Sequence, residues 1–132
     1  MGAHPDELLA LMPFAAGSGV ELDRADPAEV AGRLAWAPER CTAGGLMHGG
    51  ALMTLADSVG AVCAFLNLPP GASTATVSST TSMVRAVRSG TVHAVARPAH
   101  VGRSFVLVQV ELTDDEHRLV AQVSQTQAVL RG

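Results

Sequence analysis

The segment from Gly49 to Leu66 limits the possible folds of this chain more than any other part of the sequence. Its residues are almost all apolar, and Asp57 is the only charged one. Apolar side chains fall on nearly every side of the predicted helix, which indicates that other elements cover most of its surface. Its length would also suit a membrane span, but its glycines, a threonine, a serine and the central aspartate favour a core helix.

Asp57 and the turn before the helix form the pattern that most suggests chemistry. A charge in apolar surroundings is costly unless it has a task or a partner. The helix opens on the turn His48-Gly49-Gly50, and backbone N–H groups at a helix start have no intrahelical partner and carry partial positive charge. The Gly49 N–H directed at a carbonyl oxygen would form an oxyanion hole. The alternatives are structural: glycines that only permit a tight turn, a capping histidine and an aspartate held at an interface.

The flanking segments have the two-residue alternation that is typical of strands. The expected strands are Val20–Arg24, Glu29–Ala37, Ser73–Val87, Thr91–Val101, Ser104–Thr113 and Arg118–Leu130. Because the separators among the last four are short, we expect an antiparallel meander there. The N-terminal helical segment, within residues 1–15, is predicted as one amphipathic helix over Pro5–Phe14, followed by a turn of small residues over Ala15–Gly19.

These elements predict a single domain over residues 1–132, of the α+β class. An antiparallel sheet of about five to six strands would wrap around one long central helix. The edges and the other face of the sheet would stay uncovered, which predicts self-association.

Composition excludes several classes of function. Aromatic residues make up 3% of the chain and its formal net charge is -3, which argues against a nucleic-acid-binding surface. The histidines show no ligand spacing, so no metal site is expected. The two cysteines, Cys41 and Cys63, form no CxxC motif, and the first residues lack the basic part of a signal peptide. We therefore expect a cytoplasmic protein that neither enters nor binds a membrane.

The run GGLMHGGALMTLAD, together with VRAVRSG and HVGRS further along, resembles the hotdog-fold acyl-CoA thioesterases, in particular the PaaI-like phenylacetate-pathway group. The resemblance covers nearly the whole chain. It implies a hotdog fold, a homodimer that often pairs again into a homotetramer, and hydrolysis of an acyl- or aryl-CoA thioester. No separate cofactor is implied, since coenzyme A is part of the substrate.

The resemblance also implies roles for individual residues. Asp57 matches the catalytic acid, as nucleophile or as general base on water. Gly49 matches the N–H that polarises the thioester carbonyl, His48 the histidine beside it, and Thr76 a residue that helps to place the attacking water. Thr42 stands where many family members carry the Asn or Gln that orients the nucleophile or water.

Further residues are expected to contact the substrate or its coenzyme A part. They are Gly50, Arg85, Arg88, His100, Gly102, Arg103 and Ser104. The three arginines would meet phosphate groups. The alternative for each arginine is an ordinary solvated surface charge.

The spacing within the helix predicts a site shared between subunits. Asp57 is eight residues beyond Gly49, which places it about 12 Å further along one helix. A reacting carbonyl must lie about 3 Å from both the oxyanion donor and the attacking group. If both residues serve one substrate, Asp57 must come from a partner subunit.

The alternative function is a non-catalytic hotdog module that binds acyl-CoA or serves only oligomerisation. The departure from the family pattern at Thr42 leaves this alternative open.

Overall fold

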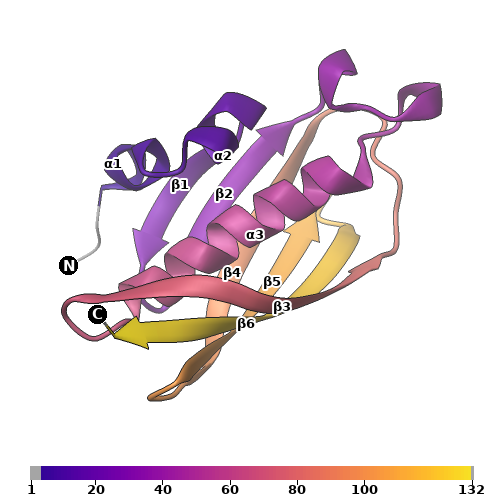
Figure 1. Cartoon of the computed structure of the whole chain (residues 1–132). Coiled ribbons are helices and arrows are strands. Elements are labelled where there is room, and N and C mark those ends of the chain that lie inside the picture. The colour runs from indigo at the N-terminus through magenta and orange to yellow at the C-terminus, as the bar shows by residue number, and fades with distance from the viewer. Residues whose placement is uncertain (1–3, 132) are drawn as a thin grey trace.

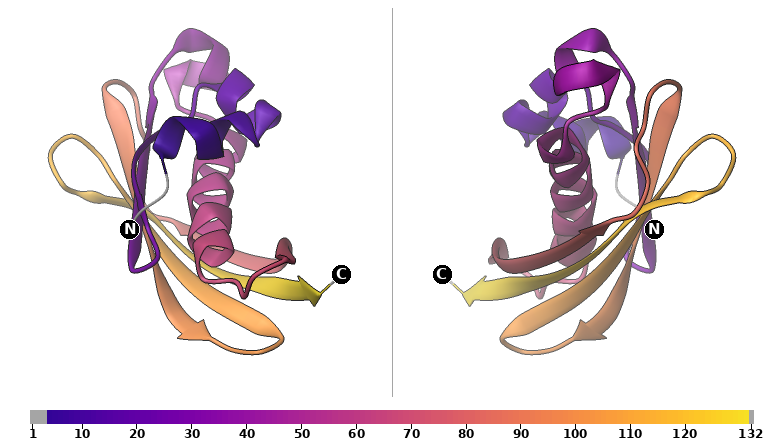
Figure 2. Two further views of the ribbon diagram at one scale, coloured as in Figure 1. Left: turned by 90° about the vertical axis from the view of Figure 1, so that its left-hand side faces the viewer. Right: turned by 90° about the vertical axis from the view of Figure 1, so that its right-hand side faces the viewer.

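A computed structural model describes residues 4–131, and its central element is the predicted helix α3 (Gly49–Leu66). The helix lies in the concave face of one six-stranded antiparallel sheet (Figure 1). The strands are β1 (Glu21–Asp26), β2 (Glu29–Ala35), β3 (Ala72–Met83), β4 (Thr91–Val101), β5 (Phe105–Thr113) and β6 (Leu119–Arg131). Figure 2 shows the sheet curving round the helix. The predicted α+β architecture is confirmed.

The core lies between α3 and the concave face of the sheet. Inward and outward residues alternate along β5: Val106, Val108 and Val110 are buried, whereas Phe105 and Leu107 are exposed. The same alternation in β4 buries small residues under the helix. Because the inward side chains of β4 are small, the sheet can approach the helix closely.

The predicted meander is wrong for its first strand. β4, β5 and β6 are sequential neighbours, but the strand order is β1-β2-β4-β5-β6-β3, so β3 pairs with β6 and forms a sheet edge. β4 lies between β2 and β5 instead. The physical reason is that α3 crosses the concave face and delivers the chain to the edge far from β2. The segment 84–90 then returns past the start of the helix, where the Met47 N–H donates to Val87 O over 2.8 Å.

The single predicted N-terminal helix is also wrong. The structure has two short helices, α1 (Pro5–Ala10) and α2 (Pro13–Ser18), and α2 includes most of the predicted turn of small residues. Proline at position 13 has no N–H to continue α1 and restricts the residue before it, yet it suits the first position of a new helix. Gly19, at a φ of 100°, ends α2.

The expectation that α3 is covered on most sides holds for only half of its residues. The sheet covers one side. Met53, Asp57 and Phe65 are exposed, in a stripe at four-residue spacing that also contains the half-buried Ala61. Length and composition alone would allow α3 to cross a membrane, but its packing against the sheet is that of a core helix. Asp57 is therefore not a buried charge within one chain.

Gly32 of β2 marks a close contact between helix and sheet. A Cβ there would lie 2.8 Å from Val59 Cγ2 and 2.9 Å from Glu21 O. We predict that Gly32→Ala lowers the free energy of unfolding by roughly 1–3 kcal/mol, because overpacking forces side chains and backbone apart. Gly17→Ala, in α2 with no atom within 4 Å of the added carbon, is the control and should be neutral or stabilising by up to about 1 kcal/mol. Urea denaturation measures both; equal stabilities of Gly32→Ala and wild type would contradict the contact.

Cys63 is buried in α3, and burial raises the pKa of its thiol to about 11. Since the thiolate is the reactive form, we predict that iodoacetamide at pH 8 leaves Cys63 unmodified in the folded protein and alkylates it after unfolding in guanidinium chloride. Peptide mass spectrometry distinguishes Cys63 from the half-buried Cys41. Rapid alkylation of Cys63 in the folded protein would show that the helix is not packed as described.

Candidate active site

His48 caps the start of α3 through its side chain. Its backbone is extended, and its ring Nδ1 accepts a hydrogen bond from the Gly50 N–H over 2.7 Å. A Cβ on Gly50 would lie 2.9 Å from this nitrogen, so the second glycine makes room for the ring. Because Nδ1 accepts, the neutral ring carries its proton on Nε2. The turn thus fixes the His48 ring and its tautomer.

The Gly49 N–H is the donor that this turn leaves free. The N–H groups of Ala51 and Leu52 both donate to His48 O, whereas the Gly49 N–H has no hydrogen-bond partner among residues 4–131. Gly49 lines a cavity of about 350 Å³ together with Thr42. The structure thus brings three of the predicted site residues, Thr42, Gly49 and Arg85, to one cavity, and the free donor of Gly49 lies at the N-terminus of the helix.

Asp57 lies on a different part of the surface. Its Oδ1 accepts two hydrogen bonds of 2.9 Å, one from the Thr76 hydroxyl of β3 and one from Gln125 Nε2 of β6. It lines a second cavity, of about 220 Å³, which it shares with Met53 and Thr81 but not with Gly49. The predicted pair of Asp57 and Thr76 is brought together, and within one chain it is separate from the Gly49 turn.

Thr81 adds an unused polar group beside Asp57. Its hydroxyl is the one buried side-chain polar atom without a hydrogen-bond partner in the part of the chain that the structure describes. A buried group of this kind normally bonds to water or to a ligand. Thr81 is therefore a further polar residue in the lining of the cavity beside Asp57.

Two residues near Asp57 were not predicted from the sequence. Gln125 and Gln127 of β6 are buried and point to the same side of the sheet as α3. The alternation of β6 could have identified them, because both glutamines lie an even number of residues from the buried Val123 and therefore on the same face of the strand. Polar residues at inward strand positions are unusual, and this marks them as candidates for a site.

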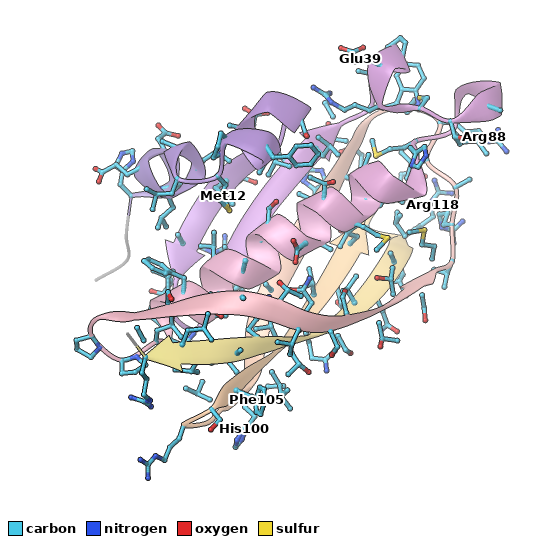
Figure 3. The ribbon with its side chains drawn as sticks, in the orientation of Figure 1. Met12, Glu39, Arg88, His100, Phe105 and Arg118 are labelled. Carbon is cyan, nitrogen blue, oxygen red and sulfur yellow. The ribbon has the colours of Figure 1, made fainter. Side chains whose placement is uncertain are left out.

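The residues predicted to contact coenzyme A fall into two groups. Arg85 lines the cavity of Gly49, and Arg88 lines a neighbouring cavity of about 410 Å³ with three acidic residues of the β5–β6 turn. His100, Gly102, Arg103 and Ser104 lie in and beside the β4–β5 hairpin. Figure 3 shows Arg88 and His100 at opposite ends of the molecule. One chain therefore does not bring these two groups together.

A fourth cavity lies beside the α3 N-terminus. It has a volume of about 550 Å³ and is lined by His48, Gly50 and Thr54 of the helix region, with Phe14 of α2. Phe14 is 75% exposed, which is unusual for an aromatic side chain. Gly50, which was predicted to contact the substrate, is one of the residues that line this cavity. Within residues 4–131, no cluster of three His, Cys, Asp or Glu residues has the arrangement of a metal site.

Comparison with known proteins identifies the class. The family model of the thioesterase superfamily matches residues 44–121, which include the turn, α3 and Asp57. Protein Rv1847 of Mycobacterium tuberculosis H37Rv is 31% identical over 121 residues, covering 89% of this chain and 86% of that protein. The 1,4-dihydroxy-2-naphthoyl-CoA hydrolase of Escherichia coli K12 is 34% identical over 86 residues, covering 65% of this chain and 63% of the hydrolase.

Solved structures agree on the fold. A mutant of the thioesterase PA1618 from Pseudomonas aeruginosa has a TM-score of 0.92 at 24% identity, covering 98% of this chain and 96% of that one. A thioesterase protein of Streptococcus pneumoniae TIGR4, solved with coenzyme A, has a TM-score of 0.82 at 22% identity, covering 94% and 99%. A long helix held in a curved antiparallel sheet with this turn and acid defines a hotdog-fold thioesterase. The chain belongs to the thioesterase superfamily.

The capping role of His48 can be tested separately from catalysis. We predict that His48→Ala lowers the free energy of unfolding by about 1 kcal/mol, because the Gly50 N–H loses its acceptor. His48→Asn should recover most of this loss, since asparagine is a good N-cap residue. Thermal denaturation of the two variants measures the difference. Equal destabilisation by both substitutions would show that the ring does not cap the helix.

Proposed function

We propose that this protein is an acyl-CoA thioesterase that hydrolyses an acyl- or aryl-CoA thioester to the free acid and coenzyme A, without a separate cofactor. The observation that carries the proposal is the pairing of a free Gly49 N–H at a helix start with an exposed, hydrogen-bonded Asp57 on the same helix. The first is an oxyanion donor and the second an attacking group or base. Superfamily membership supports thioester hydrolysis, and the name of the E. coli relative supports a coenzyme A thioester.

The proposed site combines two subunits. Gly49 and Asp57 line different cavities in one chain, and the helical spacing of about 12 Å keeps them apart. β3 is a sheet edge with mostly exposed side chains, and it lies beside the exposed stripe of α3 that carries Asp57. Pairing of two β3 edges would satisfy the free strand edge and bring the Asp57 surface of one subunit to the other. We propose a homodimer with two such sites, which pairs again into a tetramer.

Two routes are open for the chemical step. In the first, an Asp57 oxygen bonds to the thioester carbonyl carbon, the C–S bond breaks and the thiolate leaves; water then cleaves the mixed anhydride to the acid and restores the carboxylate. In the second, Asp57 takes a proton from water and the hydroxide attacks the carbonyl carbon; the C–S bond then breaks, and the proton passes from Asp57 to the departing thiolate. In both routes the Gly49 N–H stabilises the oxyanion, and the fixed His48 ring orients the substrate.

The remaining roles extend this proposal. Thr42 lies in the cavity of Gly49 and would act on the nucleophile or water. The Thr76 hydroxyl donates to Asp57. It would help to place the attacking water, either by holding the carboxylate that binds the water or by accepting a hydrogen bond from the water itself. We propose that Arg85 and Arg88 contact the phosphates at the Gly49 end, together with the segment from His100 to Ser104 of another subunit. The cavity beside Phe14 would take the acyl or aryl group.

Substitution of Asp57 tests the proposed acid directly. We expect Asp57→Asn, which keeps the size of the side chain, to lower kcat by at least a hundredfold, because it removes the nucleophile or base. Release of free thiol from a panel of acyl- and aryl-CoA esters measures the rate, and circular dichroism controls for folding. Wild-type protein that folds but hydrolyses none of the esters would favour the non-catalytic alternative, and an active Asp57→Asn variant would refute the assignment.

The shared site predicts complementation between two inactive proteins. Gly49→Pro removes the oxyanion donor, and Asp57→Ala removes the acid of the other half-site. Mixed dimers of the two variants contain one intact site, so we expect up to half of the wild-type activity per dimer. Isolation of mixed dimers with two different affinity tags makes the measurement independent of exchange. Verified mixed dimers without activity would contradict a site shared across subunits.

A further inference from the structure

The inward face of β6 carries two buried glutamines beneath Asp57. Gln127 is fully buried and Gln125 is 2% exposed, and with Ser58 they are the only buried polar residues in the described part of the chain. Burial of a side-chain amide is costly unless its donors and acceptors are bonded. The pair therefore requires an explanation that the roles proposed above do not give.

The hydrogen bonds of the pair run in one direction, toward Asp57. Gln127 Nε2 donates to the Thr76 hydroxyl oxygen over 2.7 Å and to Gln125 Oε1 over 2.9 Å. Gln125 Nε2 in turn donates to Asp57 Oδ1 over 2.9 Å. Both amide protons of Gln127 are used in these two bonds. The Thr76 hydroxyl accepts one of them and donates its own single proton to Asp57 Oδ1, which as a carboxylate oxygen can only accept.

The backbone of β3 and α3 is adapted to this arrangement. Thr76 stands directly opposite Gln127 in the β3–β6 pair, and the register shifts immediately after Thr76. On the helix, a Cβ at Gly60 would lie 2.5 Å from Gln125 Oε1, so the glycine leaves room for the amide. Bulges of this kind are frequent beside active sites. Two other elements thus accommodate the glutamines.

The two oxygens of Asp57 end up in different situations. Oδ1 accepts from Thr76 and Gln125, whereas Oδ2 has no hydrogen-bond partner among residues 4–131. Rotation of the carboxylate would break both bonds at once. We propose that Gln125 and Gln127 are positioning residues that hold Oδ1, so that Oδ2 alone attacks the thioester or takes the proton from water. This inference rests on the proposed function.

The kinetic test compares three glutamine-to-methionine variants on wild-type background. Gln125→Met and Gln127→Met keep a long side chain and remove the amide, whereas Gln122→Met changes an exposed glutamine of the same strand and is the matched control. We expect Gln125→Met and Gln127→Met to lower kcat on the order of 10- to 100-fold, because small displacements of a reacting group have effects of this size. KM should change less than twofold, and Gln122→Met should match wild type.

The outcomes separate this inference from the proposed function. If wild type hydrolyses thioesters and Asp57→Asn does not, then folded Gln125→Met and Gln127→Met variants with unchanged kcat overturn the positioning role. A rise in KM with unchanged kcat also overturns it, since that indicates substrate binding. If Asp57→Asn is fully active, the proposed function itself has failed, whatever the glutamine variants show.

A second measurement does not depend on the stability of the glutamine variants. In amide-labelled protein, the side-chain NH₂ resonances of Gln125 should shift on Asp57→Asn, because the charged acceptor is replaced by a neutral amide. Those of Gln122 should stay within the experimental error. Unchanged Gln125 resonances would overturn the hydrogen bond, and with it the proposal.

Discussion

The structure depends on the contact between α3 and only one side of a curved sheet. The inward valines and alanines of β4 and β5 bury half of the helix, and the sheet ends before it can cover the rest. What stays exposed is a stripe that carries Asp57, next to the free edge of β3. Burial on one side thus stabilises the domain, while the lack of cover on the other side leaves the acid accessible to the second subunit of the proposed dimer.

The Gly49 turn and the Asp57 carboxylate are held in place by different kinds of interaction. The Gly49 turn is local: the His48 ring accepts from a neighbouring N–H, and glycines leave room for it and free one donor. The setting of Asp57 is long-range, since β3 and β6 each send one donor to the same oxygen. The first arrangement follows from a few consecutive residues, whereas the second requires that the sheet be fully assembled.

Acidic and basic side chains meet around the cavity that Arg85 and Arg88 share with the β5–β6 turn. In the β5–β6 turn, the Arg118 N–H donates to Asp114 and lowers the pKa of that carboxyl, and the His93 ring does the same for Asp115. Arg85 and Arg88 make no salt bridge among residues 4–131. Their charges are thus available to an anionic ligand, which is the role that the proposed function gives them.

The sequence by itself determined the features that depend on neighbouring residues. The apolar run gave α3 its observed bounds, the alternation of β5 assigned its inward valines, and the spacing of Gly49 and Asp57 separated them along the helix. Pro13 was a local signal that the prediction of one N-terminal helix overlooked. Only the tertiary structure decided that β3 pairs with β6, that Asp57 is exposed, and that Gln125 and Gln127 reach it and Thr76. The physical reason is that helix periodicity and turn chemistry act over a few residues, whereas strand order is set by how α3 crosses the sheet, and no short stretch of sequence records that crossing.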